Sequence, residues 1–153
     1  MLYRGDTDGP YPTNETTTNG QTRIKGWVRT VKPEEADGFK PMAQGWCAAF
    51  LGAMLAKCGL AHTGNLGANT YADLDKWGQE CGEVVGAIAV YENHVGIVTK
   101  TGIMLGRKRG DIIGGNQSGA VNILPQSEFK AFLGYRWPKE CPCPDEAGVQ
   151  NSP

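Results

Sequence analysis

The sequence predicts an α+β domain in which N-terminal helices pack on an antiparallel sheet of about five strands. Three observations lead to this fold class. A strongly helical pattern comes early, the apolar runs after it have the short period of strands, and 22 of the 153 residues are glycine. A helical region followed by consecutive strands is typical of α+β architecture. Abundant glycine favours tight turns over a helical bundle.

Length and charge narrow the class of protein further. A chain of 153 residues fits one domain and can bury a core without metal or disulfide staples. Its 15 basic and 16 acidic residues give a net charge of -1, which argues against an electrostatic grip on nucleic acid or on an anionic membrane. No apolar run reaches the roughly 18 residues that a membrane-spanning helix needs. No apolar stretch follows a basic start, so we expect a protein made in the cytoplasm without a signal peptide.

Three segments are expected along the chain. Residues 1–40 are polar and rich in turn-forming pairs, so we interpret them as an irregular arm packed on the domain, with one short helix or strand near residues 24–31. Residues 41–138 hold the helical and strand patterns and form the domain itself. Residues 139–153 are rich in proline and hold few apolar side chains, which predicts a flexible tail.

The helical pattern is strongest over residues 47–58, where apolar side chains recur at steps of three and four. Four alanines add helix propensity, and Gly59 is well placed as the C-terminal cap. Residues 70–73 resemble an N-terminal capping box, which predicts a second, shorter helix that ends near Gly78 or Gly82.

Short apolar runs after the helical region predict five strands, because they are bounded by turn-forming residues. These runs lie at residues 87–91, 95–99, 111–116, 120–123 and 134–137. Turns are expected at Glu92-Asn93 and at Ser118-Gly119. The order of helices first and strands afterwards indicates an antiparallel sheet with helices on one face.

Cys47 stands at the expected start of the strongest helix. The positive end of the helix dipole and the N–H groups of the first turn favour the thiolate, which is the reactive form of cysteine. The backbone N–H of Cys47 is also a natural donor to an oxyanion. A cysteine on an apolar helix face is more often a core residue, and Cys58 and Cys81 fit that interpretation. The position of Cys47 at the helix start favours a nucleophile.

A thiolate nucleophile needs a base and a group that orients the base. His94 opens the second expected strand and is the candidate base. Asn116 ends the third expected strand and is the candidate orienting residue. Alone, His94 would more often be structural, and Asn116 could simply adopt a turn conformation after two glycines. The assignment depends on these residues occurring together with Cys47.

Four motifs resemble those of small cell-wall amidases of the NlpC and CHAP type. They are QGWCAAF at residues 44–50, HVGIV at 94–98, GGNQS at 114–118 and LGYRWP at 133–138. All four occur in the order of one subgroup, which is known mainly from phage and bacterial genomes. The resemblance covers about residues 41–138.

This resemblance implies a papain-like fold and a cysteine amidase or endopeptidase that acts on peptidoglycan. Carried onto this chain, Cys47 is the nucleophile, His94 the general base and acid, and Asn116 the orienting residue. Gln117 is a second candidate for the orienting role or for substrate contact. Gln44 is the candidate for the second oxyanion donor.

Two positions depart from the CHAP pattern. Trp46 stands where glutamine often precedes the cysteine, and Gly114 stands where an acidic residue is common near the third motif. An aromatic side chain such as Trp46 lines a sugar-binding groove or fills the core. Five cysteines at irregular spacing do not indicate a disulfide framework. Cys141 and Cys143 could bridge or bind metal, and a free tail is the favoured interpretation.

We therefore expect a peptidoglycan-degrading cysteine hydrolase that cuts an amide bond in the stem peptide or at the muramoyl-L-alanine link. No metal or cofactor is expected, nor is binding to nucleic acid or insertion into a membrane. The enzyme would be a monomer that reaches the wall by holin-type release, by injection or as a virion component, with an immunity protein if it is a toxin. The alternatives are a non-catalytic wall-binding or structural phage component of the same fold, and a cysteine hydrolase or deamidase that acts on protein.

Overall fold

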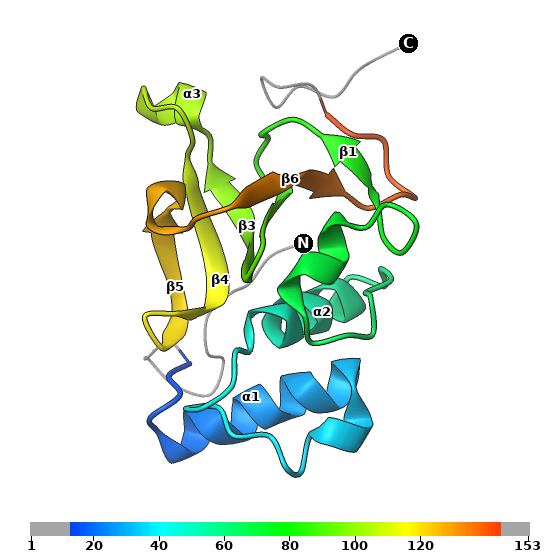
Figure 1. Cartoon of the computed structure of the whole chain (residues 1–153), viewed down its shortest axis with the longest axis vertical. Helices are drawn as coiled ribbons and strands as arrows, with labels where there is room; N and C mark the ends of the chain where they lie inside the picture. The colour runs from blue at the N-terminus through cyan, green and yellow to red at the C-terminus, as the bar shows by residue number, and fades with distance from the viewer. Residues whose placement is uncertain (1–12, 145–153) are drawn as a thin grey trace. The chain divides into compact units, whose positions relative to one another are not determined.

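The computed structural model describes residues 13–144 and combines helices with an antiparallel sheet (Figure 1). Within these residues there are three α-helices, namely α1 (Thr18–Val31), α2 (Cys47–Lys57) and α3 (Gly102–Leu105). Three short 3₁₀ helices accompany them, namely η1 (Pro33–Glu35), η2 (Ala68–Ala72) and η3 (Gln126–Glu128). This mixture of helix and sheet is that of the expected α+β class. None of these helices has the length and hydropathy of a membrane span.

The sheet of the described chain has six strands in the order β1-β6-β2-β3-β4-β5. They are β1 (Gln79–Cys81), β2 (Ile88–Tyr91), β3 (His94–Lys100), β4 (Asp111–Gln117), β5 (Ala120–Pro125) and β6 (Phe132–Trp137). All five predicted strands are confirmed, and so are the two predicted turns. The structure adds β1, whose three residues have no strand pattern of their own. It forms because β6 supplies an antiparallel partner, with Cys81 opposite Tyr135.

The described chain divides into two compact units, and each is considered by itself. The first unit holds residues 13–66 and 114–122, and the second holds residues 67–113 and 123–144. The division falls within β4 and within β5.

In the first unit, α1 is longer and more regular than the sequence predicts. The Thr17 side chain caps its start by accepting a hydrogen bond from the Gly20 N–H at 2.9 Å. Its buried face carries Trp27, whose ring lies 5.2 Å from that of Phe50 in α2. The short helix considered near residues 24–31 is therefore present, but it begins earlier than expected. The prediction of an irregular arm is wrong for the start of α1, because the turn-forming pair Asn19-Gly20 lies inside the first turn of the helix. Residues 1–12 of the predicted arm lie outside the described residues.

Helix α2 confirms the strongest sequence prediction. It ends with the two hydrogen bonds of a Schellman motif, from Gly59 N to Ala56 O at 3.0 Å and from Leu60 N to Leu55 O at 2.9 Å. Gly59 has a φ of +71°, which glycine adopts without steric penalty. The expectation that Cys58 is a core residue is wrong, because this side chain is exposed.

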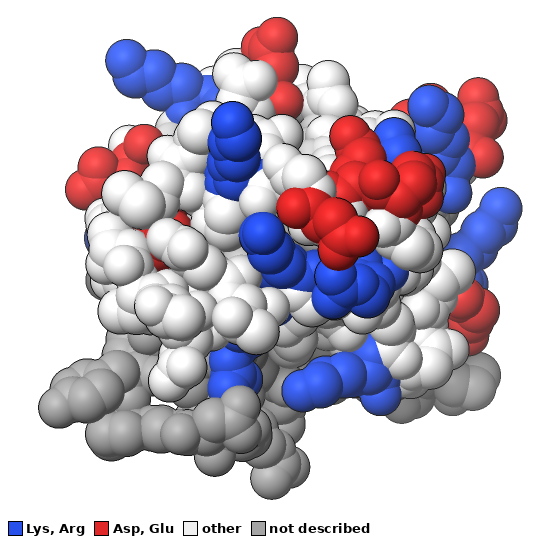
Figure 2. All heavy atoms as spheres, turned by 90° about the horizontal axis from the view of Figure 1, so that it is seen from below, with Lys and Arg blue, Asp and Glu red and all other residues white. Residues whose placement is uncertain are grey.

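Ion pairs join charged side chains of the first unit. Arg29 lies 2.9 Å from Asp37, and Lys32 lies 3.2 Å from Glu35. The face drawn in Figure 2 shows basic and acidic side chains interspersed. This mixture agrees with a net charge near zero.

The second unit is built on the hairpin of β2 and β3, in which Tyr91 lies opposite His94. Strand β6 pairs with the other edge of β2, and a bulge occurs between Val90 and Tyr91. The hydrophobic core of this unit consists of buried residues from these strands and their neighbours, namely Val84, Ala87, Ala89, Tyr91, Val98 and Ile112.

The predicted second helix is absent from the described residues of this unit. Instead, the 3₁₀ helix η2 is followed by a turn. The Thr70 hydroxyl donates to the Gly67 carbonyl at 2.7 Å, and the Asp73 carboxylate accepts from the Asp75 N–H at 3.0 Å. Both side chains therefore serve local turns, which compete with a helix cap.

A disulfide joins Cys81 in β1 to Cys143 near the end of the described chain. The Gln79 side chain adds hydrogen bonds to the Pro138 and Cys141 carbonyls, at 3.0 and 2.7 Å. Cys81 packs, partly buried, against the core of the second unit, as expected, but it is also half of a disulfide. The expectation of a free Cys143 is wrong, because the partners lie 62 residues apart and their spacing does not reveal the pair. Residues 145–153 of the predicted tail lie outside the described residues.

Candidate active site

Cys47 is the first residue of α2, as the sequence predicts. Cys47 does not take part in the disulfide, and 6% of its surface is exposed. The first turn of α2 contains no acidic residue, so no carboxylate there opposes the positive end of the helix dipole. The Cys47 thiol therefore lies at the positive end of an 11-residue helix.

Strand β4 lies very close to the start of α2 in the first unit. A Cβ atom on Gly115 would lie 2.7 Å from the Phe50 Cβ and 2.8 Å from the Trp46 Cε3. Real side chains do not come this close, so only glycine fits here. Gly115 of the third motif thus lets the strand contact the segment next to Cys47.

Asn116 follows that glycine and is also near the start of α2. Its Nδ2 lies 3.8 Å from the position of a Cβ on Gly45, two residues before Cys47. Its φ of +56° is left-handed, a conformation that asparagine tolerates better than most residues. Asn116 therefore has a left-handed backbone within β4 rather than in a turn, and its side chain lies beside the segment that leads to Cys47.

Trp46 and Gln117 are both buried, and each donates a hydrogen bond inside the first unit. The Trp46 Nε1 donates to the Glu15 carboxylate at 3.3 Å, and the Gln117 Nε2 donates to the Asn122 carbonyl at 2.7 Å. These contacts favour supporting roles over the predicted contact with substrate. The side chain of Gln44 is exposed, and its Oε1 accepts from the Lys40 N–H at 2.7 Å.

His94 belongs to the second unit, where it is the first residue of β3 and is 8% exposed. Its ring is stacked on that of Phe129, with 4.1 Å between centroids and 4° between planes. The adjacent Tyr91 ring lies 5.7 Å from that of Phe129. Aromatic contacts therefore fix the orientation of the imidazole, a feature that sequence reasoning missed because Phe129 is 35 residues away in the chain.

A hydrogen-bond network around Glu83 supports this part of the second unit. The Glu83 carboxylate accepts from the N–H groups of Gly102 and Gly110, at 2.6 and 2.7 Å. It also accepts from the Gln126 Nε2 at 2.7 Å and from the Tyr135 hydroxyl at 3.0 Å. No sequence signal marked Glu83, because its partners come from three distant segments.

The two tyrosines of this network are held as neutral donors. Burial, followed by the negative charge of Glu83, raises the pKa of the Tyr135 hydroxyl well above its ordinary value. Burial also raises the pKa of Tyr91, and the Arg109 guanidinium partly offsets that rise. The Tyr91 hydroxyl donates to the Gln126 Oε1 at 2.9 Å, which connects the network to the strand residue opposite His94.

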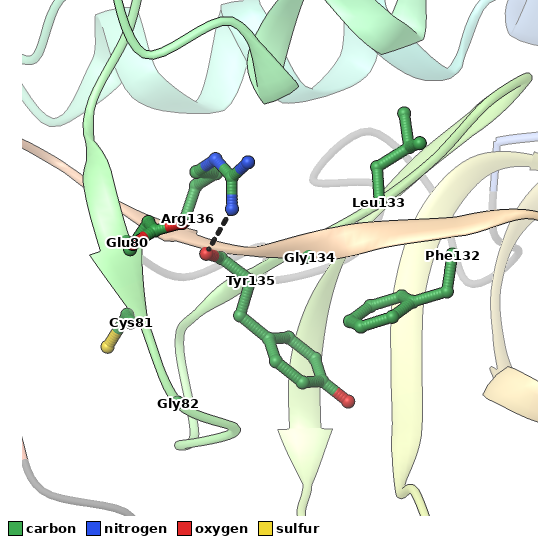
Figure 3. Close-up of a pocket in the computed structure, with 8 residues that line it drawn as sticks. All are labelled: Glu80, Cys81, Gly82, Phe132, Leu133, Gly134, Tyr135 and Arg136. Atoms are coloured by element: carbon green, nitrogen blue, oxygen red, sulfur yellow. Dashed lines mark hydrogen bonds between the residues drawn. The ribbon is translucent and has the colours of Figure 1, made fainter.

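A pocket of the second unit lies between β1 and β6 and contains none of the predicted site residues (Figure 3). Figure 3 shows Leu133 and Arg136 on one side of β6, with Phe132 and Tyr135 on the other. The Arg136 guanidinium donates to the Tyr135 carbonyl at 2.9 Å and to the Ala72 carbonyl at 3.1 Å. These bonds give Arg136 a structural role, which is to hold η2 to β6.

The first unit therefore brings Cys47 and Asn116 to the same helix end, and the second unit carries His94. The pairing of Cys47 with His94 stays a prediction. Within residues 13–144, no group of three or more His, Cys, Asp or Glu side chains is arranged to hold a metal ion. Comparison of the chain with protein-family models, with curated proteins and with solved structures finds no match.

Proposed function

We propose that this chain is a cysteine hydrolase of papain-like fold that degrades bacterial peptidoglycan. It would cut an amide bond in the stem peptide or at the muramoyl-L-alanine link. The observation that carries the proposal is the position of Cys47 at the first residue of α2, with Asn116 beside the segment that precedes it. The four motifs that resemble cell-wall amidases supply the substrate class.

The proposed reaction is acyl transfer through a covalent intermediate. The Cys47 thiolate attacks the amide carbon, and the oxyanion accepts hydrogen bonds from the Cys47 N–H and the Gln44 Nε2. His94 has taken the proton of the Cys47 thiol, and it gives this proton to the leaving amine as the C–N bond breaks. It then takes a proton from water, which attacks the thioester and releases the acid. The resemblance gives Asn116 the role of orienting the imidazole for both steps.

The disulfide supports a site of action outside the cytoplasm. Disulfides persist in oxidising compartments and are rare where thiols are kept reduced. The bond between Cys81 and Cys143 therefore fits a protein that reaches the wall by holin-type release, by injection or as part of a virion.

Digestion of purified peptidoglycan tests the proposal. We expect soluble fragments from the wild type, and a rate at least about 1000-fold lower from Cys47→Ala, because the nucleophile is lost. Cys58→Ala is the matched control, since this thiol lies at the other end of the same helix and is exposed. Fragment masses from mass spectrometry would name the bond that is cut.

Two results of this digestion would contradict the proposal. If the wild type releases no fragments from either Gram-negative or Gram-positive walls, the protein is not a wall hydrolase, and a binding role or a protein substrate is favoured. Equal fragments from the wild type and Cys47→Ala would mean that another residue is the nucleophile.

A further inference from the structure

The connection between β3 and β4 presents two apolar side chains to solvent. We call residues 101–110 the tip loop. It contains α3, which follows the end of β3 (Figure 1). Ile103 is 76% exposed and Met104 is 63% exposed, more than any other large hydrophobic residue in the described chain. Adjacent apolar residues at such exposure often mark a surface that contacts a partner.

Hydrogen bonds and close backbone contacts hold both ends of the tip loop. The Glu83 carboxylate accepts hydrogen bonds from the N–H groups of Gly102 and Gly110, near both ends of the loop. A Cβ on either glycine would collide with backbone, that of Arg107 or that of Lys100. The Thr101 side chain also caps α3. A loop fixed in this way presents its apolar pair without a large ordering cost on binding.

Basic residues flank the apolar pair along the chain. Lys100, Arg107 and Lys108 are exposed. Arg107 forms an ion pair with Asp111 at 2.6 Å, whereas neither lysine has an ion pair within residues 13–144. The tip loop is therefore locally basic although the whole chain has a net charge of -1. An anionic surface complements this arrangement.

We propose that the tip loop docks on the surface of an anionic phospholipid bilayer. Ile103 and Met104 enter the boundary between headgroups and acyl chains, while Lys100, Arg107 and Lys108 lie among the phosphates. Such docking is peripheral and reversible, and it does not depend on the proposed hydrolase activity. The net charge of the chain gives no indication of it, because the three basic residues concerned all lie within residues 100–108.

Sedimentation with vesicles tests the proposal on the full chain. The vesicles contain equal parts of phosphatidylglycerol and phosphatidylcholine, and pure phosphatidylcholine vesicles are the neutral comparison. We expect binding to the anionic vesicles that weakens with added salt. The double variant Ile103→Asp/Met104→Asp should bind anionic vesicles at least about tenfold more weakly than the wild type, because its apolar contact is lost. Digestion of purified peptidoglycan, which contains no bilayer, should stay unchanged.

Matched variants separate the tip loop from a general effect of added charge. Leu74→Asp/Val85→Asp changes two apolar residues, 41% and 46% exposed, in turns of the same unit and should bind as the wild type does. Lys108→Glu should weaken binding, whereas Lys76→Glu should not. The proposal is overturned if the wild type does not bind anionic vesicles, if it binds neutral ones equally well, or if the Ile103/Met104 variant keeps its affinity.

Discussion

The start of α2 and the Glu83 network hold candidate site residues by different physical means. Around Cys47, the structure depends on close packing, since Gly115 contacts Trp46 and Phe50 without room for a methyl group. Around His94, it depends on a ring stack and on hydrogen bonds that converge on one carboxylate. The stability of the first region should therefore fall when a side chain is enlarged. The stability of the second should fall when a polar side chain or the disulfide is removed, or when a tyrosine loses its proton.

The disulfide is a covalent cross-link within the second unit, so its removal should lower the free energy of unfolding more than the other changes below. We expect Cys143→Ser to lower the free energy of unfolding by roughly 4 kcal/mol, because a bond between residues 62 apart restricts the unfolded chain. Cys141→Ser is the control and should stay near the wild type. Denaturant unfolding under oxidising conditions measures both, and equal losses in the two variants would contradict the pairing.

Loss of the Glu83 carboxylate should have the next largest effect. In Glu83→Ala, the N–H groups of Gly102 and Gly110 and the side chain of Gln126 lose their acceptor. We expect unfolding to become easier by about 3 kcal/mol, since partly buried donors are left unpaired. The matched change Glu80→Ala removes an exposed carboxylate from β1 and should have little effect. Similar values for the two variants would mean that the network does not stabilise this unit.

Added volume should be felt at the start of α2. Gly115→Ala puts a methyl group against Trp46 and Phe50, and we expect a loss of about 2 kcal/mol from overpacking. Gly26→Ala is the control of opposite sign, because a Cβ there meets no atom within 4 Å and alanine favours the helix. Thermal unfolding compares the two, and a neutral Gly115→Ala would show that β4 does not lie so close to α2.

Alkaline pH should weaken the polar network and spare the packed site. The pKa of Tyr135 is raised in the folded protein, so folding holds this proton more tightly than the unfolded chain does. Its contribution is complete below the ordinary pKa of about 10 and is lost as the pH rises through the higher folded value. At alkaline pH the free energy of unfolding should fall by roughly 1 kcal/mol less in Tyr135→Phe than in the wild type. The free energy of unfolding, measured below and above a pH of about 10, should therefore depend less on pH in the variant than in the wild type. An equal dependence in both proteins would count against the network.

The sequence predicted the parts of the fold that depend on local pattern. The helix from Cys47 and the five strands follow from the spacing of apolar residues and from turn residues beside them. The start of α1 was missed because Asn19-Gly20 is typical of a turn. Strand β1 and the disulfide were missed because each depends on a partner about 60 residues away.

The candidate site divides in the same way. Cys47 could be placed at a helix start, and Asn116 near the end of a strand, because both are local features. The role of Gly115 could not be predicted, since it needs α2 and β4 to meet. The stack of His94 on Phe129 and the hydrogen bonds of Glu83 likewise depend on contacts between distant segments.

The central claim is that the start of α2 makes Cys47 a reactive thiolate, and labelling of the native protein with iodoacetamide tests it most directly. Mass spectrometry of peptides gives the rate at each cysteine at neutral pH. We predict that Cys47, although only 6% exposed, is alkylated at least about tenfold faster than the exposed Cys58 at the other end of the helix. Faster alkylation of Cys58, in the order that exposure alone would give, would contradict the claim.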